Sequence, residues 1–197
     1  MIIAKNAGGS NYEPLAAGSY AARCYSMIEI GTNEETILGK VKNLHKVRIS
    51  WELPTETKVF KEENGEQPHV VSKEFTLSLH EKATLRKFLE SWRGKAFTEQ
   101  EAEAFDITKL LGVECMLSII HKTSGAGKVY VDISGVSKLP KGMECPAPVN
   151  ERQELSFSEW KQDLFESLPS FIKEKIMTSE EYTAMGFEEK TEDEIPF

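Results

Sequence analysis

The chain has 197 residues, of which 40% are hydrophobic and 28% are charged. This length suits one domain with extensions or two small domains, and the composition excludes a chain that is disordered throughout. No apolar run approaches the roughly 20 residues of a membrane-spanning helix, and the first residues do not resemble a signal peptide. The three cysteines are far apart, so we expect no disulfide framework, no membrane partner and a cytoplasmic location.

The net charge of −8 lies entirely in the last quarter of the sequence. Residues 1–149 contain 19 basic and 19 acidic side chains, whereas residues 150–197 contain 5 and 13. The neutral part of the chain can therefore still carry a basic face that binds nucleic acid. The acidic end is expected to be a separate functional element.

A flexible arm and a first strand are expected at the start of the chain. Residues 1–17 are rich in Gly, Asn and Ala and have no periodicity, whereas residues 18–30 alternate as a strand does. Residues 31–35 have the composition of a turn. The predicted apolar face contains Tyr20, Ala22, Cys24, Ile28 and Ile30, and the opposite face contains Arg23, Tyr25 and Glu29.

Regular alternation predicts a second strand over residues 46–53 and a third over residues 70–79. Pro54 is expected to end the second strand, and residues 58–68 to form a long polar loop. Trp51 shares a face with Val47, Ile49 and Leu53, so we expect it in the core.

The spacing of apolar residues then becomes helical over residues 80–92, which places Trp92 in the core as well. Gly94 is expected to end this helix, and Ser78 or His80 to begin it. Thr98 and Glu101 have the spacing of a capping box at the start of a short helix.

Two further strands are predicted over residues 113–119 and 129–136, joined by a hairpin loop. The order of strands and helix is that of an OB fold, a five-stranded barrel with a helix between strands 3 and 4, in a mainly β protein of the α+β class. The predicted parts are a flexible arm (1–17), an OB-fold domain (18–145), a linker with two C-terminal helices over residues 156–168 and 169–185 (146–185), and a disordered acidic tail (186–197).

The sequence ends in acidic residues followed by an apolar tripeptide with a free carboxylate. This ending resembles the C-terminal tip of bacterial and phage single-stranded DNA-binding proteins, and residues 51–53, 75–82 and 85–95 are similar to phage proteins proposed to bind single-stranded DNA. The resemblance implies an OB domain and a tip that docks on proteins of DNA replication and recombination. The matching tip residues are Asp193, Glu194, Ile195, Pro196 and Phe197.

One departure from that family is the absence of the usual long Gly, Gln and Pro-rich linker, which the two predicted helices replace. The tip also has a physical rationale of its own, because Phe197 offers a ring to a pocket and a terminal carboxylate can pair with a basic rim. A merely solubilising acidic tail is the alternative.

Binding single strands without sequence preference requires cations for the phosphates and aromatic rings for the bases. For each lysine taken alone, a solvated surface charge is the alternative. The predicted basic contacts are Lys40, Lys42, Lys46, Arg48, Lys58, Lys61, Lys73, Lys122 and Lys128, and the predicted stacking residues are Phe60, Tyr25 and Tyr130.

Other kinds of site find little support in the sequence. Residues 124–129 imitate a phosphate-binding loop, but the spacing of Gly125 and Gly127 and the presence of Val129 after Lys128 do not fit the pattern, so a hairpin loop is expected. The histidines and cysteines form no close metal-binding pair, although distant ligands could converge on zinc. No nucleophile and base are recognisable, so we expect neither an enzyme nor a cofactor.

Together these observations predict a phage protein, acting in the cytoplasm of the bacterial host cell, that binds single-stranded DNA and recruits replication or recombination proteins through its tip. The competing hypothesis is an adaptor protein with a β-barrel body that binds no DNA and docks partners through its acidic C-terminus. The sequence leaves the oligomeric state open, a homo-oligomer included.

Overall fold

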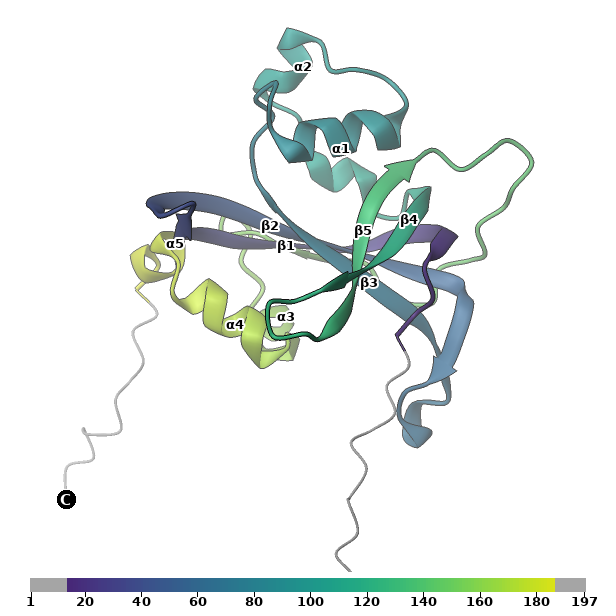
Figure 1. Ribbon diagram of the computed structural model, residues 1–197. Helices are drawn as coiled ribbons and strands as arrows, with labels where there is room; N and C mark the ends of the chain where they lie inside the picture. The colour runs from purple at the N-terminus through teal and green to yellow at the C-terminus, as the bar shows by residue number, and fades with distance from the viewer. Residues whose placement is uncertain (1–13, 187–197) are drawn as a thin grey trace, which may run out of the picture.

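The computed structural model describes residues 14–186 of an α+β protein, a six-stranded sheet with several short helices (Figure 1). None of the helices in this part of the chain is long and apolar enough to cross a membrane. The strands are β1 (Gly18–Ile37), β2 (Lys40–Val59), β3 (Glu66–Thr76), β4 (Glu114–Thr123), β5 (Val129–Ser137) and β6 (Gln153–Leu155). The α-helices are α1 (Thr84–Arg93), α2 (Glu99–Glu103), α3 (Gln162–Ser167), α4 (Ser170–Met177) and α5 (Glu180–Ala184), and the 3-10 helices are η1 (Glu62–Asn64) and η2 (Ile107–Leu110).

The sheet is open, with its strands in the order β3-β2-β1-β4-β5. These neighbours are antiparallel, and β6 adds to β1 in parallel. Three strands, a helix and two strands are thus confirmed, but the sheet stays open and does not form the expected five-stranded barrel. Closure needs a hydrogen-bonded ladder between the edge strands. Among the described residues, β3 and β5 have none, and the side chain of Lys73 bridges them instead, with Nζ 2.8 Å from Asp132 Oδ1 and 2.6 Å from the Ile133 carbonyl oxygen.

A β-bulge in β1 corrects the predicted faces of this strand. Cys24 pairs with Trp51 and Ser26 with Ser50, which leaves Tyr25 as the extra residue. One extra residue reverses the side on which the following side chains lie, here up to a second register shift between Glu29 and Gly31. Cys24 therefore belongs to the main core, whereas Ile28 and Ile30 pack on the other side of the sheet.

The β1–β2 hairpin is longer than predicted. Residues 31–35, expected as a turn, belong to β1 and pair with β2. The actual turn lies at Leu38 and Gly39, whose φ angles of 51° and 74° are both positive, as in a type I′ turn. Pro54 does not end β2 because β1 stops pairing at Glu52, and the strand passes the proline through an irregularity in its pairing with β3.

Two further predicted boundaries were wrong. Residues 58–68, expected as a long loop, form the ends of β2 and β3 around the short η1 helix. Helix α1 begins after Ala83 rather than at Ser78 or His80. Its end at Gly94, with φ 65°, and the capping box of Thr98 and Glu101 are confirmed.

The main core lies between the sheet and α1, and aromatic side chains fill its centre. Trp51 is fully buried, and its ring centroid lies 5.6 Å from those of both Phe88 and Trp92. Burial of Trp51 and Trp92 is therefore confirmed. The segment before β1, predicted as part of a flexible arm, is anchored from residue 14 onward, because Leu15 is buried and its carbonyl oxygen lies 2.7 Å from His121 Nε2.

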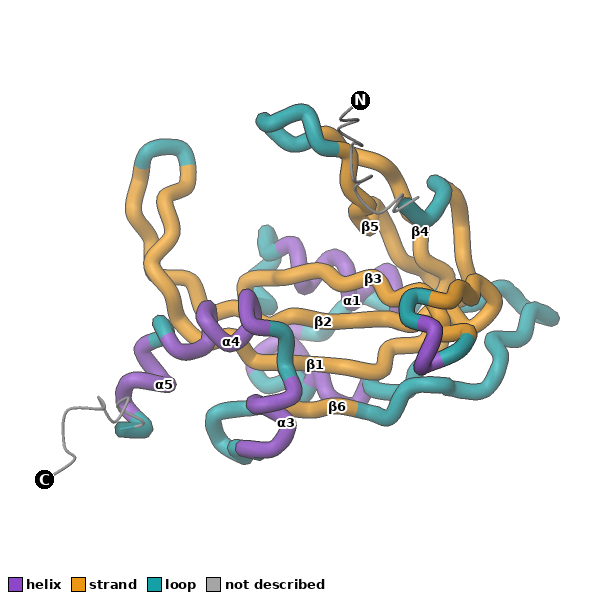
Figure 2. Tube along the Cα trace, turned by 90° about the horizontal axis from the view of Figure 1, so that it is seen from below, coloured by secondary structure: helices purple, strands orange, loops and turns teal. Residues whose placement is uncertain are grey.

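The C-terminal segment, residues 146–186, forms β6 and three short helices where two longer helices were expected. Figure 2 shows these elements along β1, on one side of the sheet. A second core joins this segment to β1, and it consists of Ile28, Ile30, Leu155, Phe165, Leu168, Ile172 and Ile176. Glu52, fully buried, accepts hydrogen bonds from the backbone N–H groups of Val149 and Asn150 and from the Asn150 side chain.

Candidate nucleic-acid interface

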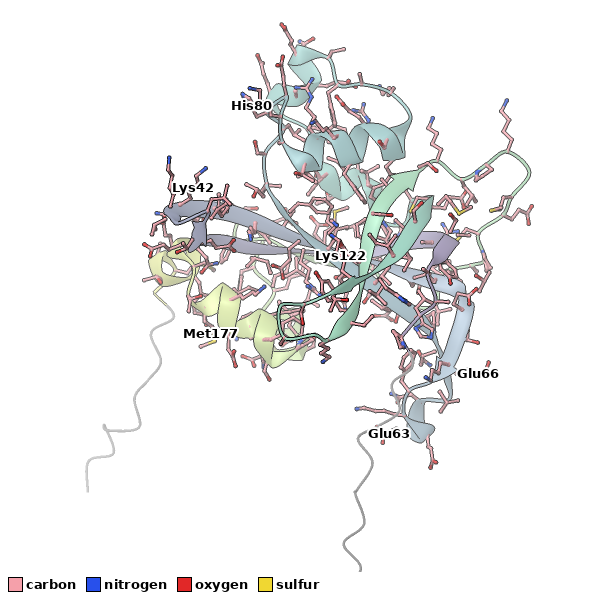
Figure 3. All side chains as sticks on the ribbon, viewed as in Figure 1. Lys42, Glu63, Glu66, His80, Lys122 and Met177 are labelled. Carbon is pink, nitrogen blue, oxygen red and sulfur yellow. The ribbon has the colours of Figure 1, made fainter. Side chains whose placement is uncertain are left out.

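Two hairpins project from the same side of the sheet, as Figure 2 shows: β1–β2 and β4–β5. In Figure 3, Lys42 marks the first hairpin, Lys122 the second and His80 the segment before α1. Two hollows of about 500 and 270 Å³ adjoin at Lys73 and Thr84, which line both. We call them together the basic groove, because its lining contains Lys46, Lys73, Lys82 and Lys87, beside His80, against Glu35 and Glu74.

Two predicted lysines line this groove, but each is held by a carboxylate. Lys46 Nζ lies 2.5 Å from Glu35 Oε1, and Lys73 Nζ lies 2.8 Å from Asp132 Oδ1. Burial alone would raise the pKa of Asp132, but the ammonium groups of Lys122 and Lys73 hold it below its ordinary value. A phosphate that bound here would have to displace these carboxylates.

The groove contains two lysines that the sequence did not single out as contacts. Lys82 and Lys87 are exposed, and neither forms an ion pair within residues 14–186. Lys87 and Ser91 line the groove one helical turn apart, opposite the buried face of α1 that contains Leu85 and Leu89. Helical periodicity alone could therefore have identified Lys87 as an exposed cation on the outer face of α1.

The tip of the β1–β2 hairpin combines cations with exposed apolar side chains. Lys40 and Lys42, predicted as contacts, follow Leu38, which is 98% exposed. Ile37 and Val41 are also exposed. Leu38 lies in a left-handed turn and does not pack against the rest of the described protein, so the hairpin tip presents apolar surface to a binding partner. The turn lies at Ile37-Leu38-Gly39, later in the chain than residues 31–35, where the sequence predicted it.

The β4–β5 hairpin carries three of the predicted contacts. Lys128 is exposed at its loop, and Tyr130 is 45% exposed on β5 opposite Lys122 in the strand register. Lys122 forms an ion pair with Asp132. These side chains lie on the second hairpin that flanks the basic groove.

Three predicted contacts lie elsewhere. Lys58, Phe60 and Lys61 are at the β2–β3 hairpin, and nearly the whole length of β2 separates them from Lys40 and Lys42. Figure 3 shows this hairpin, marked by Glu63 and Glu66, far from the end that carries Lys42. The Phe60 ring is exposed, but it packs edge-on against His69 with 5.0 Å between ring centroids.

The last two predicted contacts, Arg48 and Tyr25, are half-buried. The Arg48 guanidinium lies 5.4 Å from the ring centroid of Phe171 in α4 and forms an ion pair with Glu74. Tyr25 is half-buried at the bulge, and burial together with the charge of Glu52 raises the pKa of its hydroxyl. Sequence periodicity placed both residues on the face opposite the main core, but it could not show that α4 packs against Arg48.

The predicted docking tip, Asp193 to Phe197, lies outside the described residues. Within residues 14–186, no three His, Cys, Asp or Glu side chains come together to hold a metal ion. Cys24 and Cys115 are buried free thiols, and burial raises the pKa of Cys24 to about 12. A thiol with so high a pKa is a poor nucleophile and a poor metal ligand at neutral pH.

No protein-family model matches this sequence, and no curated protein matches it significantly. The proposed function therefore rests on the fold and on the geometry of the site.

Proposed function

We propose that this protein binds single-stranded DNA without sequence preference and acts in DNA replication or recombination. The observation that carries the proposal is the position of the basic groove between two hairpins that present lysines and exposed apolar side chains. The order of strands and helix supports it, because it is that of an OB fold, in which the strand 2–3 face and the loops between strands 1–2 and 4–5 bind oligonucleotides.

In this proposal the strand runs along the groove between the hairpins. Lys82 and Lys87 bind phosphates directly, and Lys46 and Lys73 do so after releasing Glu35 and Asp132. Bases pack against the apolar tip at Leu38 and against the ring of Tyr130. Base-face contacts of this kind tolerate any sequence, because every base has a π-face.

The acidic C-terminal tip has a different role in the proposal. It docks on a replication or recombination protein through Phe197 and the neighbouring carboxylates. Deletion of Pro196 and Phe197 is therefore expected to weaken partner binding and to leave DNA affinity unchanged.

One observation favours the adaptor as a second candidate function. Lys46, Arg48, Lys73 and Lys122 all form ion pairs with carboxylates of their own chain, which lowers the positive charge available to phosphates. In that case the body binds no DNA, and the same lysines only hold the strands together.

Anisotropy of a labelled oligo-dT, with a duplex of equal length beside it, separates the two candidates. We expect binding to the single strand over the duplex, with a log–log salt slope of about −0.7 per phosphate neutralised. The double variant Lys82→Ala/Lys87→Ala should weaken binding and flatten the slope by about 0.7 for each lost phosphate contact. The matched control is Lys109→Ala/Lys161→Ala, two exposed lysines that do not line the groove. Absence of binding at low salt, also without residues 187–197, would leave the adaptor.

A further inference from the structure

A second cavity, of about 390 Å³, lies next to the basic groove and differs from it in charge. It opens between β1, the segment after β3, the α2–η2 region and β6. Ser78 and Leu85 line both hollows, so the two are neighbours. The apolar lining consists of Met27, Val47, Leu77, Leu79, Leu85, Ala102, Ala104, Phe105, Ile107 and Leu155.

All charged side chains that line this cavity are acidic: Glu29, Glu103, Asp106 and Glu154. Two of them have structural partners, because Glu29 accepts a hydrogen bond from the Phe157 N–H and Asp106 caps η2 through the Thr108 N–H. Glu103 and Glu154 form no side-chain hydrogen bond or ion pair within residues 14–186. We call the whole feature the acidic-rimmed cavity.

The negative charge of this rim determines which kind of ligand the cavity favours. Carboxylates around a low-dielectric hollow concentrate a negative potential, which repels nucleic acid and attracts cations. It also disfavours the acidic end of this chain, Glu192 to Glu194. The volume lies in the range of binding cavities and accommodates an apolar side chain with its neighbouring backbone.

We propose that the acidic-rimmed cavity is a docking site for a segment of a partner protein that presents an apolar side chain between Lys or Arg residues. The apolar side chain enters the cavity against its buried lining, which includes Val47 and Leu155, and the flanking cations pair with Glu103 and Glu154. This inference does not depend on DNA binding. A partner docked here contacts the body of the protein, beside the groove and apart from the acidic tip.

Anisotropy of a fluorescein-labelled peptide of sequence KKLFKK, measured on the full-length protein without DNA, tests the proposal. The control peptide KKSSKK has the same charge and lacks the apolar pair, so it should bind at least about tenfold more weakly if the apolar lining contributes. Equal binding of both peptides would overturn the proposal, because it would reduce the interaction to general attraction by an acidic protein.

Two variants locate the site. Glu103→Gln/Glu154→Gln removes the unpaired rim charges, one exposed and one half-buried, and should weaken KKLFKK binding about tenfold. Glu99→Gln/Glu159→Gln is the matched control, since both residues are exposed and neither lines the cavity. Equal loss in both double variants would overturn the assignment.

Filling the cavity provides an independent measurement. Ala102→Phe places a ring in the hollow and should abolish KKLFKK binding while oligo-dT binding stays as in the unmodified protein. Should this variant fail to fold, the charge variants still decide the question, because Glu103 is exposed, Glu154 is half-buried, and neither side chain has a hydrogen bond or ion pair to lose within residues 14–186. A dimer in sedimentation that Ala102→Phe dissociates would assign the cavity to a second copy of the chain and overturn the partner segment.

Discussion

Two cores lie on opposite sides of β1, and they are joined to the sheet by different interactions. The main core under α1 is held by aromatic packing around Trp51, whose indole N–H has no hydrogen-bond partner among the described residues. The second core, under the C-terminal segment, is smaller, and carboxylates also join this segment to the sheet: Glu52 accepts a hydrogen bond from the Asn150 N–H and Glu181 from the Thr32 N–H. The difference follows from β2, whose outer face is polar, so that its cover must bind polar groups as well as bury apolar ones.

The largest expected effect comes from a variant that disrupts the main core. Trp51→Ala removes a fully buried ring that contacts Phe88 and Trp92, and should lower the free energy of unfolding by about 3–5 kcal/mol. Because this core joins most strands to α1, the loss should be global and visible as one shifted transition in urea. The exposed control Val70→Ala should stay within about 0.5 kcal/mol. A Trp51→Ala protein as stable as the control would contradict the aromatic core.

The second prediction tests whether the C-terminal core opens separately. Ile176→Ala empties a fully buried position in α4 and should cost about 2–5 kcal/mol locally. Native-state hydrogen exchange should then speed up in α4 and α5 more than in α1 and β2. Met177→Ala, on the exposed side of the same helix, is the matched control. Uniform acceleration over the whole sheet would show that both cores unfold as one unit.

The two cores also differ in how well the sequence predicted them. Alternation in β2 identified the buried face with Trp51, because one side of that strand lies entirely in the main core. The same reasoning failed in β1, where the bulge at Tyr25 exchanges the faces. The position of this bulge depends on how β1 pairs with β2, and no local residue pattern predicts it. The β1–β2 arm was missed because its residues pair with each other without burying a continuous apolar face.

For the candidate site, the sequence predicted the types and approximate positions of the residues but not their partners. Lysines on the hairpins and at Lys46 and Lys73 were recognised by type and position, but their ion pairs depend on carboxylates far away in sequence, such as Asp132. The cover over Arg48 depends on β6, a three-residue strand too short to produce a periodic signal.

The third prediction acts at the contact between β1 and the C-terminal segment. Gly31 has a φ of 85°, and a Cβ there would lie 2.6 Å from Ser179 Cβ, so Gly31→Ala combines backbone strain with a clash. Gly39→Ala is the matched control, since φ is 74° and nothing lies within 4 Å. Strain should cost about 1–2 kcal/mol in both, and the clash should add about 1–3 kcal/mol only at Gly31. Equal melting temperatures for the two variants would mean that α5 does not hold this position.

The smallest expected effect comes from pH, through the carboxylate of Glu181. Its two oxygens accept hydrogen bonds from the Thr32 N–H and hydroxyl, each at 2.6 Å, and one lies 3.4 Å from His45 Nδ1. Burial alone would raise the pKa of Glu181, but the hydrogen bonds from Thr32 and the charge of His45 lower it below the ordinary value of 4.5. A lowered pKa in the folded state stabilises the protein above the unfolded value, and this contribution is lost as the pH falls through the folded value.

Acidification from about pH 6 to about pH 3 should therefore release α5 from β1 before the main core opens. The protection factor of the Thr32 amide, measured by hydrogen exchange, reports this step directly because that N–H is bonded to Glu181. In Glu181→Gln the same amide should be less protected at pH 6 and lose little more on acidification, since the titrating group is gone. If Thr32 protection in the unmodified protein instead falls only together with that of Trp51, the carboxylate contact does not open separately, and the two cores respond to acid as a single cooperative unit.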